Sequence, residues 1–459
     1  MSAATATAQS AGAFAGGDRA AKLMHRMDAT MPTAMLKKVM ALTSAGLFVD
    51  AMDVYLAGGV KSTLVDTGFA TNDQTALFLS AGFLGLFIGS LIAGLIGDIL
   101  GRRKAFQYNL LIFGLATIAG ALSPNMEFMI AMRFIVGLGL GSELVTSFSM
   151  INEFAPVKRR GRWCAMGNAI ANCGSPLGMF LCLLFISMTH PLGDQSWRLV
   201  FVVIGIAAIV ICILRHAMPE SPRWLIQHGR LDDAEKIISE IEREMKEAGV
   251  APATDVVEKS TVLQTDEHLG RNVFLAIAMS VGVSLASYTY TTFGPSILKE
   301  VGMATSTSLL STTITMLAAP LGALIGALLI EKIGRRVNII GGFTWVAVFA
   351  LAYGLTLSSG NAQVTTVLGF LMTIGFYVLF ASIIGVYVTE LFSTKYRFRG
   401  AGVANGAGKL VNVAMPFAVT WLLANMQPSA IYFAIVAIAV VAAIIEAAIG
   451  PETRAQRLG

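Results

Sequence analysis

Long apolar stretches divide this chain, and they constrain its fold more than any other feature. A helix of about 20 apolar residues crosses a hydrocarbon core of about 30 Å, and backbone groups inside lipid must be hydrogen-bonded within helices or closed barrels. The sequence therefore predicts an all-α membrane protein with twelve spanning helices. We place them at residues 39–60, 75–97, 105–123, 126–148, 163–187, 198–217, 272–296, 307–330, 339–358, 363–388, 400–424 and 429–449.

Composition supports a chain embedded in lipid. Hydrophobic residues make up 55% of the 459 residues and charged residues only 13%, whereas about a quarter of a soluble protein is charged. Residues 1–38 contain no apolar stretch ahead of a cleavage site, so no signal peptide is expected. All four cysteines lie in apolar runs without metal-ligand spacing, and we interpret them as packing residues.

Basic residues mark one side of the predicted spans. Of the 33 lysines and arginines, only Lys61, Arg198 and Lys299 fall on the other side, and Arg133 and Lys409 fall inside spans. Cytoplasmic loops hold the excess of basic residues, so both chain ends are expected in the cytoplasm of a bacterial inner-membrane protein. The predicted divisions are an N-terminal segment (1–38), a six-helix bundle (39–217), a linker with an amphipathic helix (218–271), a second bundle (272–449) and a tail (450–459).

Three landmarks recur in the second half of the chain. GDILGRRK at 97–104 reappears as IEKIGRRV at 330–337, INEFAPVKRRG at 151–161 as VTELFSTKYRFRG at 388–400, and PESPR at 219–223 as PETR at 451–454. Each copy follows the equivalent helix of its half. The two six-helix bundles are therefore predicted to be pseudo-symmetric.

GDILGRRK with its copy, PESPRWL and PETR resemble the major facilitator superfamily over nearly the whole chain. The resemblance implies two bundles that rock about a central site. FVDAMDVYL and GLGLGSEL are similar to segments of the bacterial aromatic-acid and nicotinate proton symporters, a branch near the sugar porters. The paired glutamines of sugar porters are absent from VGVSLASYTYTTFGPSIL, and Val145 stands where the organic-acid branch often has proline. The resemblance therefore leaves the substrate open.

The same resemblance implies a cytoplasmic gate of ion pairs that holds the inner side shut. Its members alternate in charge and recur in both halves, although simple topology anchoring is an alternative for the arginines. They are Asp98, Arg102, Glu153 and Arg160 in the first half, and Glu331, Arg335, Glu390 and Arg397 in the second.

Charged residues inside the first and fourth spans are candidates for proton coupling, since a charge in the hydrocarbon core costs about 2.5–3.5 kcal/mol on insertion scales. At about 1.5 Å per residue, Asp53 and Arg133 fall at the same depth in a core of about 30 Å. We predict that Asp53 binds a proton and that Arg133 helps to set its affinity. Asp50, three residues earlier on nearly the same face, is the reserve candidate. A static ion pair between the two spans is the alternative.

Lys409 in the eleventh span is a candidate for binding a carboxylate. Asn405 and Asn412 lie at i−4 and i+3, so one helix face offers an ammonium group and two amides. The alternative is that Lys409 extends to the surface or pairs with an acid.

Further polar and aromatic residues near the middle of the membrane are predicted to line the substrate site. An aromatic ring prefers partners at about 4.5–7 Å between centroids, and Phe83 and Phe376 are further candidates with core packing as the alternative. Glu143 is assigned to the gate or the substrate path, with structural pairing equally open. The lining residues are Asn168, Asn172, Tyr288, Tyr290 and Tyr377.

These patterns together predict a monomeric secondary transporter for proton-coupled uptake of a small organic acid, aromatic or a pyridine carboxylate. Its partners are the substrate and the lipid bilayer, with no nucleic acid, no metal and no cofactor other than the coupling proton. A sugar or neutral-solute transporter and an exporter are the alternatives. An enzyme is excluded because the sequence contains no nucleophile and base, metal or nucleotide motif.

Overall fold

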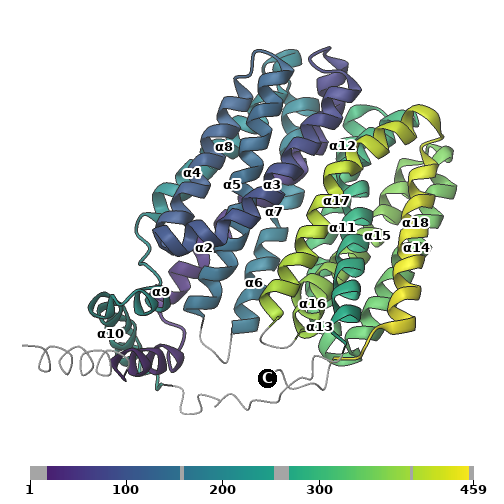
Figure 1. Ribbon diagram of the computed structural model, residues 1–459. Coiled ribbons are helices and arrows are strands. Elements are labelled where there is room, and N and C mark those ends of the chain that lie inside the picture. The colour runs from purple at the N-terminus through teal and green to yellow at the C-terminus, as the bar shows by residue number, and fades with distance from the viewer. Residues whose placement is uncertain (1–17, 156–159, 253–267, 393–395, 454–459) are drawn as a thin grey trace, which may run out of the picture.

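The structure is a computed structural model that describes residues 18–155, 160–252, 268–392 and 396–453. Within those ranges the chain is helical and contains no strand. Figure 1 shows two helical bundles side by side, the N-terminal half in purple to teal and the C-terminal half in green to yellow. This arrangement confirms the predicted all-α fold with two halves.

The helices of the N-terminal half are α2 (Ala34–Asp66), α3 (Asn72–Leu100), α4 (Arg102–Ala121), α5 (Met126–Phe154), α6 (Arg160–Asn172), α7 (Gly174–Cys182) and α8 (Trp197–Arg215). Those of the C-terminal half are α11 (Leu269–Glu300), α12 (Thr305–Met316), α13 (Ala318–Ile333), α14 (Arg335–Thr356), α15 (Ala362–Ser382), α16 (Val388–Glu390), α17 (Arg397–Asn425) and α18 (Ser429–Ile449). Between them lie α9 (Pro222–Gln227) and α10 (Leu231–Glu247). In each half the third span packs between the fourth and the sixth, so α4 contacts α5 and α8 just as α14 contacts α15 and α18.

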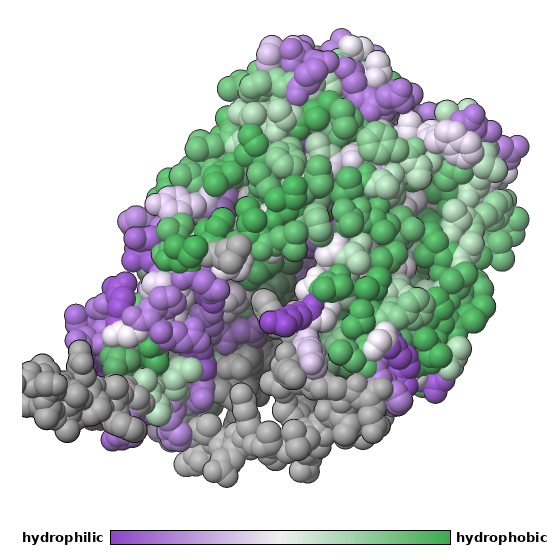
Figure 2. Space-filling view, viewed as in Figure 1, coloured by the Kyte–Doolittle hydropathy of each residue, from purple (hydrophilic) through white to green (hydrophobic). Residues whose placement is uncertain are grey.

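In the described ranges, 11 stretches of helix are long and apolar enough to cross a membrane. The predicted span that is not among these 11 is 105–123, which corresponds to α4; this helix opens on Arg102, Arg103 and Lys104 and is therefore less apolar. Its packing against α5 and α8 nevertheless makes it a full member of the N-terminal bundle. Apolar side chains cover both bundles as a broad band with polar groups at its two ends (Figure 2), as a lipid-facing surface requires.

Three predicted spans are not single α-helices. The span at 363–388 consists of α15, a π-helical stretch (Ile383–Tyr387) and the start of α16, and the other two contain a break between two α-helices. The span at 163–187 is built from α6, α7 and a π-helical stretch (Leu183–Thr189), and the span at 307–330 from α12 and α13. Pro176 and Pro320 are each the third residue after such a break. Proline has no N–H to donate and fits best in the first turn of a helix, so each proline favours a new helix start.

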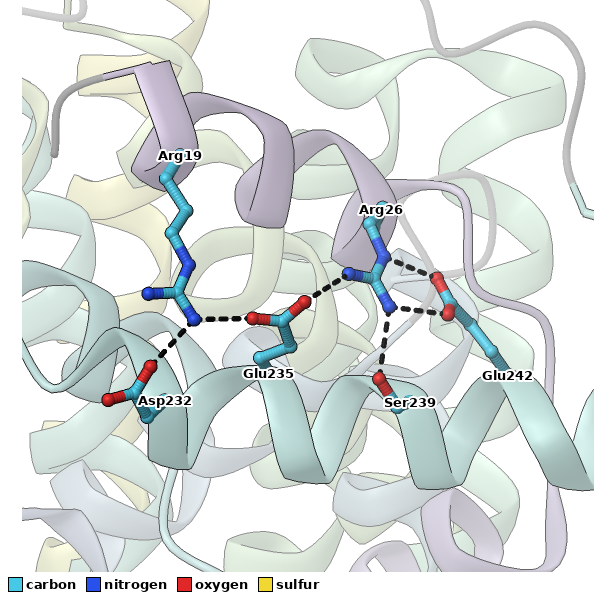
Figure 3. Close-up of polar contacts among 6 residues, drawn as sticks. All are labelled: Arg19, Arg26, Asp232, Glu235, Ser239 and Glu242. Atoms are coloured by element: carbon cyan, nitrogen blue, oxygen red, sulfur yellow. Dashed lines mark hydrogen bonds and ion pairs between the residues drawn. The ribbon is translucent and has the colours of Figure 1, made fainter. Parts of the chain in front are cut away.

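A helix at residues 18–28 lies along α10 (Figure 3). Arg26 donates to both carboxylate oxygens of Glu242, at 2.8 and 2.6 Å, and Arg19 donates to Asp232 at 2.7 Å and to Glu235 at 2.5 Å. Apolar side chains are buried beneath these pairs, and α10 has the amphipathic character that the sequence predicts. The buried apolar residues include Leu23, Met27, Ile238, Ile241 and Met245. We call this end of the molecule the α10 end and the opposite end the far end.

Candidate functional site

Asp53 and Arg133 form an ion pair inside the N-terminal half. Arg133 Nη1 lies 2.6 Å from Asp53 Oδ2, and its Nη2 donates to the Asp53 carbonyl oxygen at 3.4 Å. Both side chains are buried, and the guanidinium group also lies 5.4 Å from the ring centre of Phe78. Gly82 leaves the space for it, since a Cβ at this position would lie 2.9 Å from Arg133 Nε. The contact between α2 and α5 predicted from helix depth is therefore present.

A second buried ion pair joins α5 to α8. Glu143 Oε1 lies 2.6 Å from Arg215 Nη2, and both side chains are fully buried. Arg215 also donates from Nε to the carbonyl oxygen of Leu42 at 3.1 Å and from Nη2 to that of Thr43 at 3.4 Å. Its guanidinium group lies 3.5 Å from the ring centre of Phe106. Glu143 is thus held in a structural pair, one of the two roles left open by the sequence.

Asp50 lies between these two pairs along α2. It is 5% exposed, and neither carboxylate oxygen has a hydrogen-bond partner. Asp53 follows three residues later on the same face of the helix. An unpaired carboxylate at this depth is the kind of residue that marks a functional position in a membrane protein.

Lys409 on α17 has no ion-pair or hydrogen-bond partner in the part of the chain that the structure describes, and its side chain is partly accessible. Asn412 is 1% exposed, and its Oδ1 also lacks a partner. Asn405 instead donates to the Ala401 carbonyl oxygen within its own helix at 2.9 Å. Two of the three predicted polar groups on this face are therefore free to bind a ligand.

The face of α17 around Lys409 meets α3 of the other half. Ser80 donates to the Val413 carbonyl oxygen at 2.7 Å, and a Cβ at Gly406 would lie 3.4 Å from the ring of Phe87. The stretch of α3 between these contacts includes Gly82, which packs on Arg133. Lys409 and the Asp53–Arg133 pair therefore flank the same part of α3. A small cavity with room for about one or two water molecules adjoins Arg133 and is lined by Val54, Ala57, Leu79, Gly82, Phe83, Leu86, Leu140 and Thr292.

Aromatic side chains from both halves meet beside this region. Tyr55 and Tyr377 share a hydrogen bond between their hydroxyl groups, which joins α2 to α15. Phe83 and Tyr288 pack edge to face at 5.3 Å between ring centres, joining α3 to α11. Phe380 lies about equally far from Tyr288 and Tyr377, at 6.1 and 6.0 Å. Tyr288 and Tyr377 therefore lie at the interface, as predicted.

Tyr290 and Phe376 belong to a different cluster. Tyr290 packs against Tyr353, Phe376 and Tyr432 at 5.8, 6.1 and 6.3 Å between ring centres. All four rings are buried within the C-terminal half. Tyr290 and Phe376 therefore pack within the C-terminal half. Their neighbours Tyr288 and Tyr377 lie at the interface instead, because side chains one or two positions apart on a helix point in different directions.

Asn168 and Asn172 lie one turn apart on α6, and both are half-buried. Both lie on the helix that meets α13 of the other half. Their position at the interface between the halves agrees with a lining role.

The comparisons with known proteins agree with this architecture. Residues 32–459 match the family described as "Sugar (and other) transporter". The chain belongs to this family. It is a multi-pass membrane transporter of the inner-membrane type, and its relatives are transporters rather than enzymes.

Two relatives cover almost the full length of this transporter. It is 32% identical over 443 residues to the putative metabolite transport protein YdjK of Escherichia coli, with 94% of each chain covered. It is 28% identical to the niacin transporter NiaP of Acinetobacter baylyi, with 91% of this chain and 93% of the relative covered. The xylose transporter XylE of E. coli has the same fold, with a TM-score of 0.77, 19% identity, and 93% and 100% of the two chains covered.

The repeated motifs of the transporter form matching contacts at the α10 end. Arg102 donates to Glu153 at 3.0 Å, and Arg335 donates to both oxygens of Glu390 at 2.9 Å. Asp98 bonds to Arg102 at 2.9 Å. Each of these pairs joins residues of one half. The residues of the predicted gate thus form ion pairs within each bundle, whereas ion pairs between the bundles were expected.

The glycine of each repeat has a positive φ of 91° and packs against a carboxylate. A Cβ at Gly101 would lie 2.5 Å from Glu220, and one at Gly334 would lie 2.6 Å from Glu452. These carboxylates accept hydrogen bonds from the first backbone N–H groups of α4 and α14, so each caps the positive end of a helix. The repeats seen in the sequence therefore correspond to repeated structure. The side chains of Arg160, Glu331 and Arg397 lie outside the described part of the structure.

Contacts at the far end close the interface between the halves. Asp66 at the end of α2 forms an ion pair with Lys299 near the end of α11. One turn or so deeper, the ammonium group of Lys61 lies 4.3 Å from the ring centre of Phe293. The halves are therefore joined at the far end in this conformation.

Sequence reasoning missed Arg215 and Tyr55. Arg215 is the last residue of α8, where it resembles the basic residues that mark membrane topology. Tyr55 lies two residues after Asp53 within the segment FVDAMDVYL, and a polar aromatic group at that depth was the available signal.

Proposed function

We propose that this transporter carries a small organic acid, aromatic or a pyridine carboxylate, together with a proton. The observation that supports the proposal most is Lys409, a cation without a protein partner at the interface between the halves. A cation inside the membrane-spanning part of a protein is costly unless an anion compensates it, even where it is partly accessible as Lys409 is. A substrate carboxylate at Lys409, with the amide of Asn412 beside it, supplies that anion.

The aromatic rings beside Lys409 favour a substrate that is itself aromatic. Tyr55, Tyr288 and Tyr377 provide flat surfaces and hydroxyl groups from both halves. The similarity to NiaP, a niacin transporter, supports a pyridine carboxylate as the substrate class. Xylose, named for the structural neighbour, represents the neutral-solute alternative.

Proton coupling is assigned to the carboxylates of α2. Asp53 is ion-paired with Arg133, and Asp50 is buried without a partner, so proton binding and release at this helix changes the charge inside the N-terminal half. The α10 end, with most of the lysines and arginines, faces the cytoplasm on this proposal, which places both chain ends inside. The transporter acts as a monomer and needs no cofactor other than the proton.

The substrate class is tested by thermal shift of the purified transporter with nicotinate, benzoate, an aliphatic monocarboxylate and xylose, since a ligand that binds the folded state raises its apparent stability. We expect stabilisation by the aromatic acids. Lys409→Gln should abolish it, and Lys104→Gln, which changes an exposed lysine at the α10 end, should preserve it. Stabilisation by xylose alone, or an unchanged response in Lys409→Gln, would contradict the proposed site.

Coupling is tested in proteoliposomes that contain the acid identified by thermal shift. An inwardly directed proton gradient should drive accumulation of the labelled acid, and a protonophore should abolish accumulation while exchange of internal for external substrate continues. Accumulation that ignores the proton gradient would refute the coupling.

A further inference from the structure

The buried charges around the middle of α2 do not balance. Lys61, a further buried cation of this half, lies eleven residues beyond Asp50 on α2, about 16 Å along the helix, where it packs against Phe293. Two guanidinium groups, those of Arg133 and Arg215, face three carboxyl groups, those of Asp50, Asp53 and Glu143. Each arginine is already engaged by one carboxylate. Asp50 is the carboxyl group left over.

The geometry of each arginine explains why neither serves Asp50. Arg133 directs Nη1 to the carboxylate of Asp53 and Nη2 to the carbonyl of the same residue. Arg215 directs Nη2 to Glu143 and Nε to a backbone carbonyl of α2, where Gly46 lets it approach, because a Cβ there would lie 1.8 Å from Nη2. Gly46 is one turn before Asp50. The carboxyl group thus lies between two compensated pairs and is itself uncompensated.

Among the residues that the structure describes, the surroundings of Asp50 supply no cation besides these two arginines. The charged groups near it are Asp53 on its own helix and the Glu143–Arg215 pair of α5 and α8, which packs on Gly46 one turn before Asp50. Two of these are carboxyl groups, and their charge disfavours a third. The other helices that pack on α2 are α3, α6, α7, α10 and α11. Helix α10 reaches the start of α2, where its Glu244 accepts a hydrogen bond from the Met35 N–H group, four turns away from Asp50. The charged residues of α3, α6 and α11 lie towards the helix ends, and α7 has none.

We propose that Asp50, and not Asp53, carries the coupled proton in this conformation, and that the Glu143–Arg215 pair sets when it is released. An ionised carboxylate that is buried without a hydrogen bond is strongly disfavoured, and such a group takes up a proton instead. On this proposal Asp53 stays ionised because Arg133, 2.6 Å away, compensates its charge. This assignment reverses the order of the two candidates expected from the sequence, and it rests on the proposed proton coupling only for its role in transport.

The Glu143–Arg215 pair controls Asp50 through charge. Arg215 favours the ionised form of Asp50 and Glu143 favours the protonated form, so any loosening of their contact shifts the proton. All of these residues lie in α2, α5 and α8 of one half. The site therefore stays intact as the halves move, and the movement changes which side of the membrane can exchange the proton.

Infrared difference spectroscopy of the full-length transporter in lipid nanodiscs tests the assignment without any substrate. A protonated carboxylic acid has a carbonyl stretch that an ionised carboxylate lacks. We expect this band to lose one carboxylic acid in Asp50→Asn and to be unchanged in Asp53→Asn. Glu446, a fully buried carboxyl group of the other half whose oxygens also lack partners, contributes equally to each spectrum and cancels in the difference.

Two variants that leave Asp50 in place keep the test decisive if Asp50→Asn does not fold. Glu143→Gln frees Arg215 to compensate Asp50, so the Asp50 band should disappear. Arg215→Met leaves Glu143 unpaired as well, so the band should gain a second acid. Retention of the full band in Asp50→Asn or Glu143→Gln, or its loss in Asp53→Asn, would overturn the assignment.

The spectra test the Asp50 assignment and the transport assay tests proton coupling, so one hypothesis can be refuted without the other. A band that follows this pattern in a transporter without proton-driven accumulation would preserve the Asp50 assignment and refute coupling. Proton-driven accumulation with a band that persists in Asp50→Asn would preserve coupling and refute Asp50 as the carrier.

Discussion

Removing Arg133 should destabilise the transporter by an amount that depends on pH. Asp53 is fully buried and its Oδ2 lies 2.6 Å from Arg133 Nη1, so Arg133→Met leaves an ionised carboxylate without its cation. Breaking a buried ion pair in this way costs about 3–5 kcal/mol. A proton on Asp53 relieves the cost, so the loss of stability should be largest at alkaline pH and shrink as the pH falls.

The free energy of unfolding, measured by denaturant titration in mixed micelles with tryptophan fluorescence, checks this expectation. Asp53→Leu with Arg133→Met removes both charges and should recover most of the loss, since replacing a whole buried pair by apolar groups is often neutral. Lys104→Met, at an exposed position, is the control and should change stability by less than about 0.5 kcal/mol. The reasoning fails if Arg133→Met is as stable as the parent at pH 8, or if the double variant is no more stable than the single one.

Three further predictions concern the α10 end. A double-mutant cycle on Arg26 and Glu242, whose side chains are 33% and 39% exposed, should give a coupling of about 0.5–1 kcal/mol that vanishes at high salt. The hydrogen bond from Arg19 lowers the pKa of the Glu235 carboxyl group below its usual value. Its contribution is therefore complete above that usual value and is lost as the pH falls through the lowered pKa, which hydrogen exchange of residues 18–28 should report. Glu452→Gln weakens the charge-assisted cap of α14 and should cost about 1–3 kcal/mol in denaturant titration.

The fold was predictable because its main determinants are local. Apolar runs fix the spans, basic loops fix their alternation, and recurrent motifs such as those around Gly101 and Gly334 report the two-fold repeat. The breaks at Pro176 and Pro320 also have a local cause, although an apolar run alone does not show them. Helix α4 shows the converse, since its charged start lowers its apolar character while packing places it in the bundle.

The site was only partly predictable because it depends on contacts between distant residues. The contact between Asp53 and Arg133 could be predicted because the position of each residue along its span gives its depth in the membrane, and the two depths coincide. The pairing of Glu143 with Arg215 depends on how α8 ends against α2, which no spacing in the sequence records. The hydroxyl contact of Tyr55 with Tyr377 joins residues 322 positions apart and likewise needs the assembled interface.

Charge balance gives a physical reason for carrying an acid and a proton together. On the proposed scheme a carboxylate substrate neutralises Lys409 in the C-terminal half, and a proton neutralises Asp50 in the N-terminal half. Either ligand alone leaves one uncompensated charge in a low-dielectric interior, at a cost of several kcal/mol. On this scheme the fully loaded transporter avoids that cost when the halves rearrange, and the empty transporter carries one negative and one positive charge, so its net charge is the same. Coupling then needs no direct contact between substrate and proton, because each ligand removes the penalty in its own half and the movement requires both.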